Sequence, residues 1–497
     1  MKRKKYAISI LAILLLLLVN CKFDSEVLAE FTGGKITRKD LREFYPSFNI
    51  PQNENTTAIK YQMSILESIG VESIAGIEAE KQGKTKSEMF KSITELKEKQ
   101  ILVNLYRKTF LEKEMDKIDL DMVSAQMLYI KKDQNNKPSQ AKLDSLWNEI
   151  QNLKSDKEIN ALFSKESDEL GRKPVAGFVE PQCMNCLKDN ILKDIFKEGF
   201  EAKETKKFFK SEINNDYFIY RILEIKKIKK SDLLSYMKKK NKEIITLAKE
   251  FATKGEEEKK QAEYYLKDEV QVERELEMIV QRYTSELENQ VWTNEFKKQI
   301  DQSKLQFSKE IQSLFDGLSN ELPNFTKEYV LFTKDGKEYK YSDLESEFQK
   351  VNIKNITQTK NDSFAFFQSA ILPIAIFYDK KESQDLKNSD SYKKEIQSWR
   401  NKISWSLLVQ DLESKIPVPD DAKLKDIYEV GKNSSYSKPN PSNPNATIPI
   451  PFADVKQRII EEIKSNSLKS EIQKYVETLK SNYQFKVYSD KLKPNAV

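Results

Sequence analysis

The chain has 497 residues, a third of them charged, and it contains no histidine. The missing imidazole excludes histidine bases, Ser-His and Cys-His nucleophile pairs and histidine-ligated metals. Lys and Arg number 84 against 78 Asp and Glu, which gives a formal net charge of +6. With only 12 Gly and 15 Pro, the composition is typical of long amphipathic helices with some sheet, divided among several modules. We therefore expect a protein that acts by binding.

The N-terminus predicts export. The basic residues 2–5 precede an apolar run at 8–19, which is shorter than the about 20 residues that span a bilayer. The run ends in Leu-Val-Asn-Cys, a sequence similar to a bacterial lipobox, so we expect residues 1–20 to be a signal peptide and Cys21 to be lipidated. The alternative is an uncleaved anchor, and both alternatives place the chain outside the cytoplasm. Cleavage removes four positive charges and leaves about +2, which argues against a nucleic-acid partner.

The other two cysteines, Cys183 and Cys186, form a Cys-Met-Asn-Cys motif. In an oxidising compartment they could close a small disulfide loop. A zinc site would need two further ligands from a chain without histidine, so we expect no metal and no cofactor. A redox CxxC usually follows a strand and opens a helix, whereas this motif follows Pro181 in a loop-like segment. A structural disulfide is the favoured interpretation, and redox catalysis is the alternative.

The first module is expected over 21–120. Residues 27–31 predict a strand, Gly-Gly-Lys at 33–35 a turn, and Thr37 the N-cap of a helix. Apolar spacing then predicts two long helices, at 58–83 and 86–114. The strand, the Gly-Lys turn, the Ile-Thr-Arg-Lys-Asp-Leu helix entry and the following helix together resemble the N-terminal chaperone domain of the SurA/PrsA class of exported foldases.

The segment 121–229 resembles the parvulin-type prolyl isomerase domain that this class carries as an insert. Residues 123–130 are similar to the opening strand V-x-A-x-H-I-L-V, and a helix at 140–153 follows. Val-Ala-Gly-Phe at 175–178 falls at the family's glycine turn, and 217–224 resembles its closing strand. The resemblance implies a small antiparallel sheet flanked by helices.

The resemblance also locates the two histidines of a parvulin site. In this chain Met127 and Phe218 occupy those positions, so the domain is expected to be catalytically degenerate. Met127, Phe178 and Phe218 are expected to line an apolar pocket for a peptide or a proline ring.

The rest of the chain suggests a second copy of the first module. Residues 329–344 repeat the pattern of strand, turn and helix entry seen at 31–41. The expected order after residue 229 is a helical connecting domain at 230–311, the second SurA-like module at 312–433, a Pro/Ser/Asn-rich flexible linker at 434–451, and a C-terminal helix and strand at 452–497 that pack back on a chaperone module.

The sequence thus predicts a mainly α fold with α+β parts, made of helical SurA-like modules and an inserted parvulin-like domain. The function that the resemblance implies is a lipid-anchored holdase of the cell envelope, facing the periplasm. It would bind unfolded exported or outer-membrane proteins through a cleft between the N-terminal domain and its returning C-terminal helix, and through the degenerate parvulin-like domain. Two alternatives stay open: an active prolyl isomerase, and a surface lipoprotein used for adhesion or envelope structure. The oligomeric state is not predicted.

Overall fold

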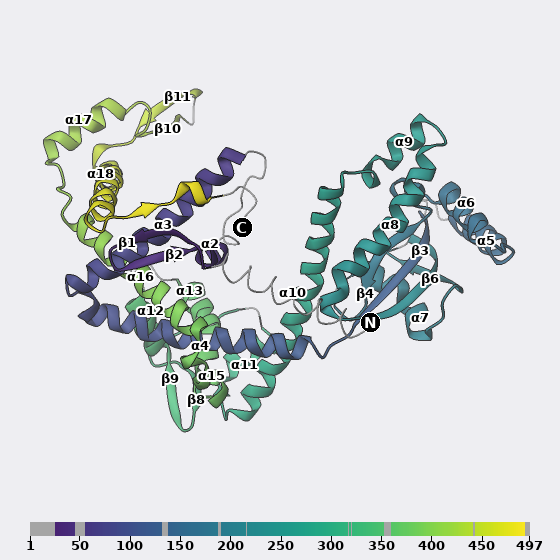
Figure 1. Ribbon diagram of the computed structural model, residues 1–497, viewed down its shortest axis with the longest axis horizontal. Helices are drawn as coiled ribbons and strands as arrows, with labels where there is room; N and C mark the ends of the chain where they lie inside the picture. Colours follow the sequence, from purple (N-terminus) through teal and green to yellow (C-terminus); the bar gives the residue numbers. More distant parts are fainter. Residues whose placement is uncertain are drawn as a thin grey trace, which may run out of the picture. The chain divides into compact units, whose positions relative to one another are not determined.

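The computed structural model divides the chain into two compact units (Figure 1). Unit 1 comprises 1–105 and 306–497, and unit 2 comprises 106–305. The structure describes residues 25–44, 55–131, 138–186, 190–214, 216–316, 318–319, 321–351, 359–440 and 443–492. The expected signal peptide and the lipidation site Cys21 lie outside these ranges.

Unit 1 begins with a β-hairpin and three helices. Gly33 makes the turn at a φ of 102°, in the left-handed region that favours glycine. Thr37 and Asp40 start the first helix, because the carboxylate of Asp40 accepts hydrogen bonds from the Thr37 backbone N–H and hydroxyl. The elements are β1 (Val27–Phe31), β2 (Gly34–Thr37), α2 (Arg38–Phe44), α3 (Asn55–Lys81) and α4 (Glu88–Met115).

The C-terminus completes this first sheet. The long helix α18 (Phe452–Asn482) leads into β12 (Lys486–Val487), which pairs antiparallel with β1 to give the strand order β12-β1-β2. The side chain of Arg38, only 1% exposed, ties the two ends together. Its guanidinium pairs with Glu26 and donates to the backbone carbonyl of Lys491 at 2.8 Å.

A second three-stranded sheet has the order β7-β8-β9. Its strands are β7 (Gln306–Phe307), β8 (Val330–Lys334) and β9 (Lys337–Lys340), and α12 (Tyr341–Val351) follows directly. The helices around it are α11 (Lys309–Phe315), α13 (Lys360–Phe366), the π-helical η6 (Phe367–Ile371), α14 (Leu372–Phe377), α15 (Lys381–Asp385) and α16 (Asp390–Ser414).

Unit 2 contains a four-stranded antiparallel sheet of order β4-β3-β6-β5. Its strands are β3 (Leu120–Ile130), β4 (Phe178–Cys183), β5 (Phe208–Ile213) and β6 (Asp216–Ile228). One face packs against α5 (Pro138–Gln151) and α6 (Asp156–Glu166), and the other against α7 (Ile191–Ala202). This is the small sheet flanked by helices that the sequence predicts.

The helical connecting domain expected at 230–311 begins with three separate helices. They are α8 (Leu233–Ala252), α9 (Glu256–Ala262) and α10 (Glu269–Gln302), separated by turns at Gly255 and Asp268. The Asp268 side chain caps α10 by accepting from the Gln271 N–H. These helices share a core with the sheet, since Met237 and Leu276 are buried together with Met122. They therefore belong to the same compact unit as the parvulin-like segment.

The flexible linker expected at 434–451 is instead a β-hairpin within the described residues. The strands β10 (Ser437–Asn440) and β11 (Asn443–Pro449) pair antiparallel after α17 (Asp421–Gly431). Tyr436 anchors the hairpin, because its buried ring packs against Val455 and Ile459 of α18. Its hydroxyl donates to Glu462 at 2.9 Å. The fold class is thus mainly α with α+β parts.

Candidate functional site

The central strands β3 and β6 carry the two positions that the resemblance assigns to histidine. In their register Met127 lies opposite Tyr220, and Phe218 lies opposite Tyr129. Alternate residues of a strand share one face, and these four side chains contribute to the cluster beneath α7. The structure therefore brings the two substituted positions onto one face of the sheet.

That face is a packed core. Met127 is 4% exposed and Phe218 is 6% exposed, and the ring centroids of Phe218 and Tyr129 are 5.5 Å apart. The Tyr129 hydroxyl donates to Asp216 at 3.0 Å, and burial together with this carboxylate raises the pKa of Tyr129 to about 12. Neither substituted position can exchange a proton, and neither has the accessible surface that a bound proline ring would need.

Phe178, the third residue expected in the pocket, lies on the opposite face. It pairs with Gln126 in the register of β3 and β4, and Gln126 and Met127 are neighbours that point to opposite faces. Phe178 packs against Ile244 of α8, whereas the next residue, Val179, joins the face beneath α7. The expected three-residue pocket does not form.

The turn before β4 explains why one glycine of the family pattern is retained. Gly177 has a φ of 74°, and a Cβ there would lie 2.2 Å from the carbonyl oxygen of Met127. The Gly177 carbonyl accepts a hydrogen bond from the Met127 N–H at 2.8 Å. Gly177 therefore fixes β4 against β3 beside the former histidine position.

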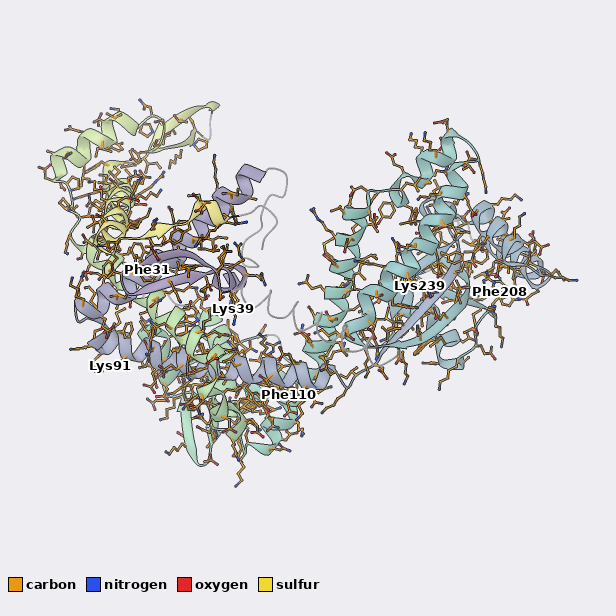
Figure 2. All side chains as sticks on the ribbon, in the orientation of Figure 1. Phe31, Lys39, Lys91, Phe110, Phe208 and Lys239 are labelled. Atoms are coloured by element: carbon orange, nitrogen blue, oxygen red, sulfur yellow. A yellow bond between two sulfur atoms is a disulfide. The ribbon has the colours of Figure 1, made fainter. Side chains whose placement is uncertain are left out.

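The face opposite α7 holds a buried polar network that the sequence analysis did not predict. The guanidinium of Arg221 donates to the Gln126 side chain and to Asp156, both at 2.8 Å. It also lies 5.6 Å from the ring centroid of Phe208 on β5, a residue that is labelled in Figure 2. Gln126 in turn donates to the Ala176 carbonyl at 2.6 Å. These hydrogen bonds pair the buried polar groups of Arg221 and Gln126. Because Asp156 belongs to α6, its bond to Arg221 also holds that helix on the sheet. The available signal was that Gln126 and Arg221 each stand between two apolar neighbours in the sequence.

Cys183 and Cys186 are joined by a disulfide, with their Cα atoms 5.4 Å apart. Both residues are fully buried. Two side chains of α10 cover the loop: Tyr283 donates to the Pro181 carbonyl at 3.2 Å, and Gln290 donates to the Cys186 carbonyl at 2.6 Å. Reactive cysteines are at least partly exposed, so this environment favours a structural role over redox catalysis.

The cleft expected between the N-terminal domain and the returning helix is filled in unit 1. Leu479 and Tyr483 of α18 are buried against Ile74 of α3. The Tyr483 hydroxyl donates to Glu78 at 2.8 Å. This helix pair therefore offers a packed interface, and open apolar surface lies elsewhere in the unit.

An open hollow of about 260 Å³ lies between α4, α14 and the β8–β9 hairpin. Phe332 and Tyr339 form one wall with stacked rings 5.0 Å apart, and Ile371 and Ile374 form another. The Tyr339 hydroxyl is buried without a hydrogen-bond partner among the described residues, and burial with nearby Glu347 raises its pKa. It is thus a neutral phenol that can donate to a ligand. The other lining residues are Ser92, Glu95, Leu96, Lys99 and Ala375.

A second hollow, of about 230 Å³, lies on the other side of Ile374. Val103 of α4 and Pro373 of α14 contribute to its lining. The wall shared with the first hollow includes the π-helical segment Phe367–Ile371, and π-helical turns occur frequently at functional sites. The first hollow is mainly apolar, whereas the second is lined mostly by polar side chains, among them Lys97, Gln100 and Asn104.

Unit 2 has a larger hollow, of about 690 Å³, between α8 and α10. Its apolar lining includes Ile245 and Leu276, and lysines from α8 surround it. One of them, Lys238, forms an ion pair with Glu273 across the two helices. This hollow therefore combines an apolar floor with a mixed but mostly basic rim.

Two classes of site are not found in the described part of the chain. There, no group of three or more Cys, Asp or Glu side chains is arranged to hold a metal ion. No helix within the same ranges has both the length and the apolar character needed to cross a membrane.

Solved structures with similarity to the chain are PrsA proteins. The peptidylprolyl isomerase PrsA of Bacillus anthracis shares 16% identity, over 40% of this chain and 94% of that chain, with a TM-score of 0.17. The foldase PrsA of Streptococcus pneumoniae shares 12% identity, over 52% and 99% of the two chains, with a TM-score of 0.19. PrsA of Bacillus subtilis shares 12% identity, over 50% and 93%, with a TM-score of 0.18.

No curated protein matches the chain. A protein-family model whose description reads only ":-like" matches residues 1–497, and the chain belongs to that family.

Proposed function

We propose that this protein is an extracytoplasmic holdase that binds unfolded exported or outer-membrane proteins without catalysing prolyl isomerisation. The observation that carries the proposal is the state of the parvulin-like domain. Its four-stranded sheet is complete, and Met127 and Phe218, at the positions that the resemblance assigns to histidine, are buried in a core. A domain kept as a scaffold without its polar site is more consistent with binding than with catalysis.

Client contact is assigned to the hollows beside α4. The half-buried side chains of Tyr339 and Ile374 give an apolar and aromatic surface of the kind that binds extended segments of unfolded chains, and the buried ring of Phe332 supports Tyr339 by stacking on it. Charged residues at the edge, Glu95 and Lys99, keep the surface hydrated between clients. Two shallow hollows bury little area, so affinity is modest and release needs no nucleotide.

The membrane tether is part of the same proposal. Lipidation of Cys21 would hold the chain at a membrane of the cell envelope, because the acyl chains carried by the cysteine insert into the lipid. Metabolic labelling with a fatty-acid analogue, compared between the wild type and Cys21→Ser, tests this directly. Labelling that persists in the variant contradicts lipidation at Cys21.

The binding site is tested by aggregation of an unfolded β-barrel client. The variant Ile374→Asp places a charge in the wall shared by both hollows, and Val430→Asp is the matched control because Val430 is 89% exposed. We expect the wild type and the control to suppress aggregation at stoichiometric amounts and Ile374→Asp to be several-fold weaker. Absence of suppression by the wild type contradicts the holdase, and full activity of Ile374→Asp contradicts the site.

The isomerase alternative has its own measurement. In a protease-coupled assay with a proline peptide, we expect rates at background. Turnover well above background that is lost on changing Met127 would establish catalysis and contradict the holdase proposal. The surface-lipoprotein alternative predicts digestion of the protein by protease added to intact cells, whereas a chaperone facing the periplasm is protected.

A further inference from the structure

The two three-stranded sheets of unit 1 have the same construction. Each hairpin skips one residue in its register, and the skipped residues, Leu28 and Leu331, are both fully buried. Each turn contains a glycine with positive φ, Gly33 and Gly336. The paired positions are Val27 with Thr37 and Ala29 with Ile36 in one sheet, and Val330 with Lys340 and Phe332 with Tyr339 in the other.

The helix entries after the two hairpins are also equivalent. The N–H of Thr37 donates to Asp40 at 2.8 Å, and the N–H of Lys340 donates to Asp343 at 2.8 Å. Further along the two segments, Ser87 caps α4 and Ser389 caps α16, each by accepting from the N–H three residues later. The correspondence therefore extends from the strands through to the long helices.

The third strand of each sheet arrives in the same way. In both cases a long helix ends, one residue adopts a left-handed conformation, and a short strand follows. The left-handed residue is Lys304 after α10, with a φ of 54°, and Gln484 after α18, with a φ of 51°. Each strand is then fixed by a backbone bond to the skipped leucine. Tyr488 donates to Leu28 at 2.8 Å, and Ser308 donates to Leu331 at 3.3 Å.

The chain order of these parts is reciprocal. The first hairpin, β1–β2, is completed by β12, which ends the second copy. The second hairpin, β8–β9, is completed by β7, which ends the first copy. We propose that unit 1 is built from two copies of one repeat that exchange their final strands, so that a single chain forms what is otherwise a strand-swapped pair of identical subunits.

The contact between α4 and α16 follows the rule for a symmetric pair. Counted from the caps Ser87 and Ser389, Phe90 corresponds to Tyr392, Ile101 to Ile403 and Leu105 to Leu407. Phe90 is buried with Ile403 and Leu407, and the equivalent Tyr392 packs with Ile101 and Leu105. The contact that a residue of α4 makes with α16 is thus repeated by the equivalent residue of α16 with α4. Such reciprocal contacts are characteristic of an isologous interface, in which both partners use the same surface.

Two contacts at the centre of this interface join equivalent positions to each other. Glu98 corresponds to Arg400, and the two form an ion pair at 2.7 Å. Lys97 corresponds to Trp399, and its ammonium lies 4.4 Å from the indole centroid. Two identical subunits would place Glu against Glu and Lys against Lys here. The copies have diverged into complementary pairs, so this face fits the other half of the same chain better than a second chain.

Cross-strand cysteine pairs test the exchange in the full chain. One pair is Glu30→Cys with Lys486→Cys, and its equivalent is Thr333→Cys with Gln306→Cys, since both are register partners. All variants carry Cys21→Ser and a protease site at 318–319, where Leu318 is 80% exposed. Oxidation or a short bifunctional thiol reagent closes each pair, and the chain is then cleaved and denatured without reduction.

We expect both cross-links to hold the two fragments together, because each sheet contains strands from either side of the cut. The control, Glu30→Cys with Lys35→Cys, links two strands on the same side, so its fragments separate. Failure of either exchange pair to form while the control forms overturns the proposal. Covalent dimers of the whole chain also overturn it, because they would show exchange between chains.

Charge reversal tests the divergence at the interface. Glu98→Arg faces Arg400 with another arginine, and Arg400→Glu faces Glu98 with another glutamate, so each restores the like-with-like contact of an identical pair. We expect each single variant to lower the thermal midpoint of unit 1 and the double reversal to recover it. Additive losses in the double variant contradict a direct contact across this interface.

Discussion

Placing histidines at Met127 and Phe218, the positions that the resemblance assigns to histidine, is the sharpest test of a closed face on the sheet of unit 2. In the double variant Met127→His/Phe218→His, two side chains that are 4% and 6% exposed are replaced by smaller polar rings. Each exchange removes burial worth about 1.5–3 kcal/mol, so the pair costs unit 2 about 3–6 kcal/mol at neutral pH if the sites are independent. We expect destabilisation and no gain of isomerase activity.

The pH dependence adds a second signature. A buried imidazole has its pKa lowered below the about 6.5 of an unfolded chain, so the unfolded state binds more protons and stability falls as pH falls through that value. At pH 5.5 each neutral buried imidazole adds about 1.4 kcal/mol to the loss. The wild type contains no histidine. The difference between the pH profiles of the variant and the wild type therefore reports the two new histidines alone, because all other titrating groups are common to both.

Urea unfolding of unit 2 between pH 5.5 and 8 measures both effects, with Trp147 as the reporter and the other tryptophans replaced. A double variant as stable as the wild type at every pH would show that the face is open to solvent. Prolyl isomerisation appearing in that variant would refute the closed core outright, because it requires room for a proline beside both rings.

Three further changes test the framework around the candidate sites. Gly177→Ala should cost unit 2 at least about 1–2 kcal/mol, since the left-handed φ is strained for alanine and the new Cβ meets the Met127 carbonyl; urea unfolding measures it. Replacing Cys183 and Cys186 by serine should cost about 2 kcal/mol for so short a loop, read as a lower thermal midpoint that added reductant does not lower further. Arg38→Ala removes the ion pair with the half-buried Glu26 and the hydrogen bond to the Lys491 carbonyl, so amide exchange of β12 should accelerate while unit 2 is unchanged.

The central strands β3 and β6 of unit 2 could be predicted because each contains a long apolar run that is largely buried. That Met127 and Phe218 share one face depends on the register between these two strands, which the resemblance implied and the period of two along a single strand does not give. The position of Phe178 could not be predicted in the same way, since its face depends on the register between β3 and β4. A shift of one residue moves a side chain to the other face, and the neighbouring Val179 is the one that joins the core.

The flexible linker expected at 434–451 was predicted from composition alone. Pro, Ser and Asn are typical of flexible linkers, but here the aromatic anchor Tyr436 and the packing of α17 on α18 decide the conformation. The hollow beside α4 was also not predictable, because Phe332 and Tyr339 become neighbours only when β8 and β9 pair. Tertiary contacts of this kind have no local signal in the sequence.

The pairing of β12 with β1 has a consequence for the order in which unit 1 can fold. The hairpin β1–β2 must wait for one of the last strands, because the sheet that contains it is closed by residues near the C-terminal end of the described chain. Until then the hairpin has an unpaired edge, with which strands of other molecules can pair. Under the export proposed above, maturation of unit 1 would be limited by completion of transport, and a chain truncated before α18 should be degraded as unfinished.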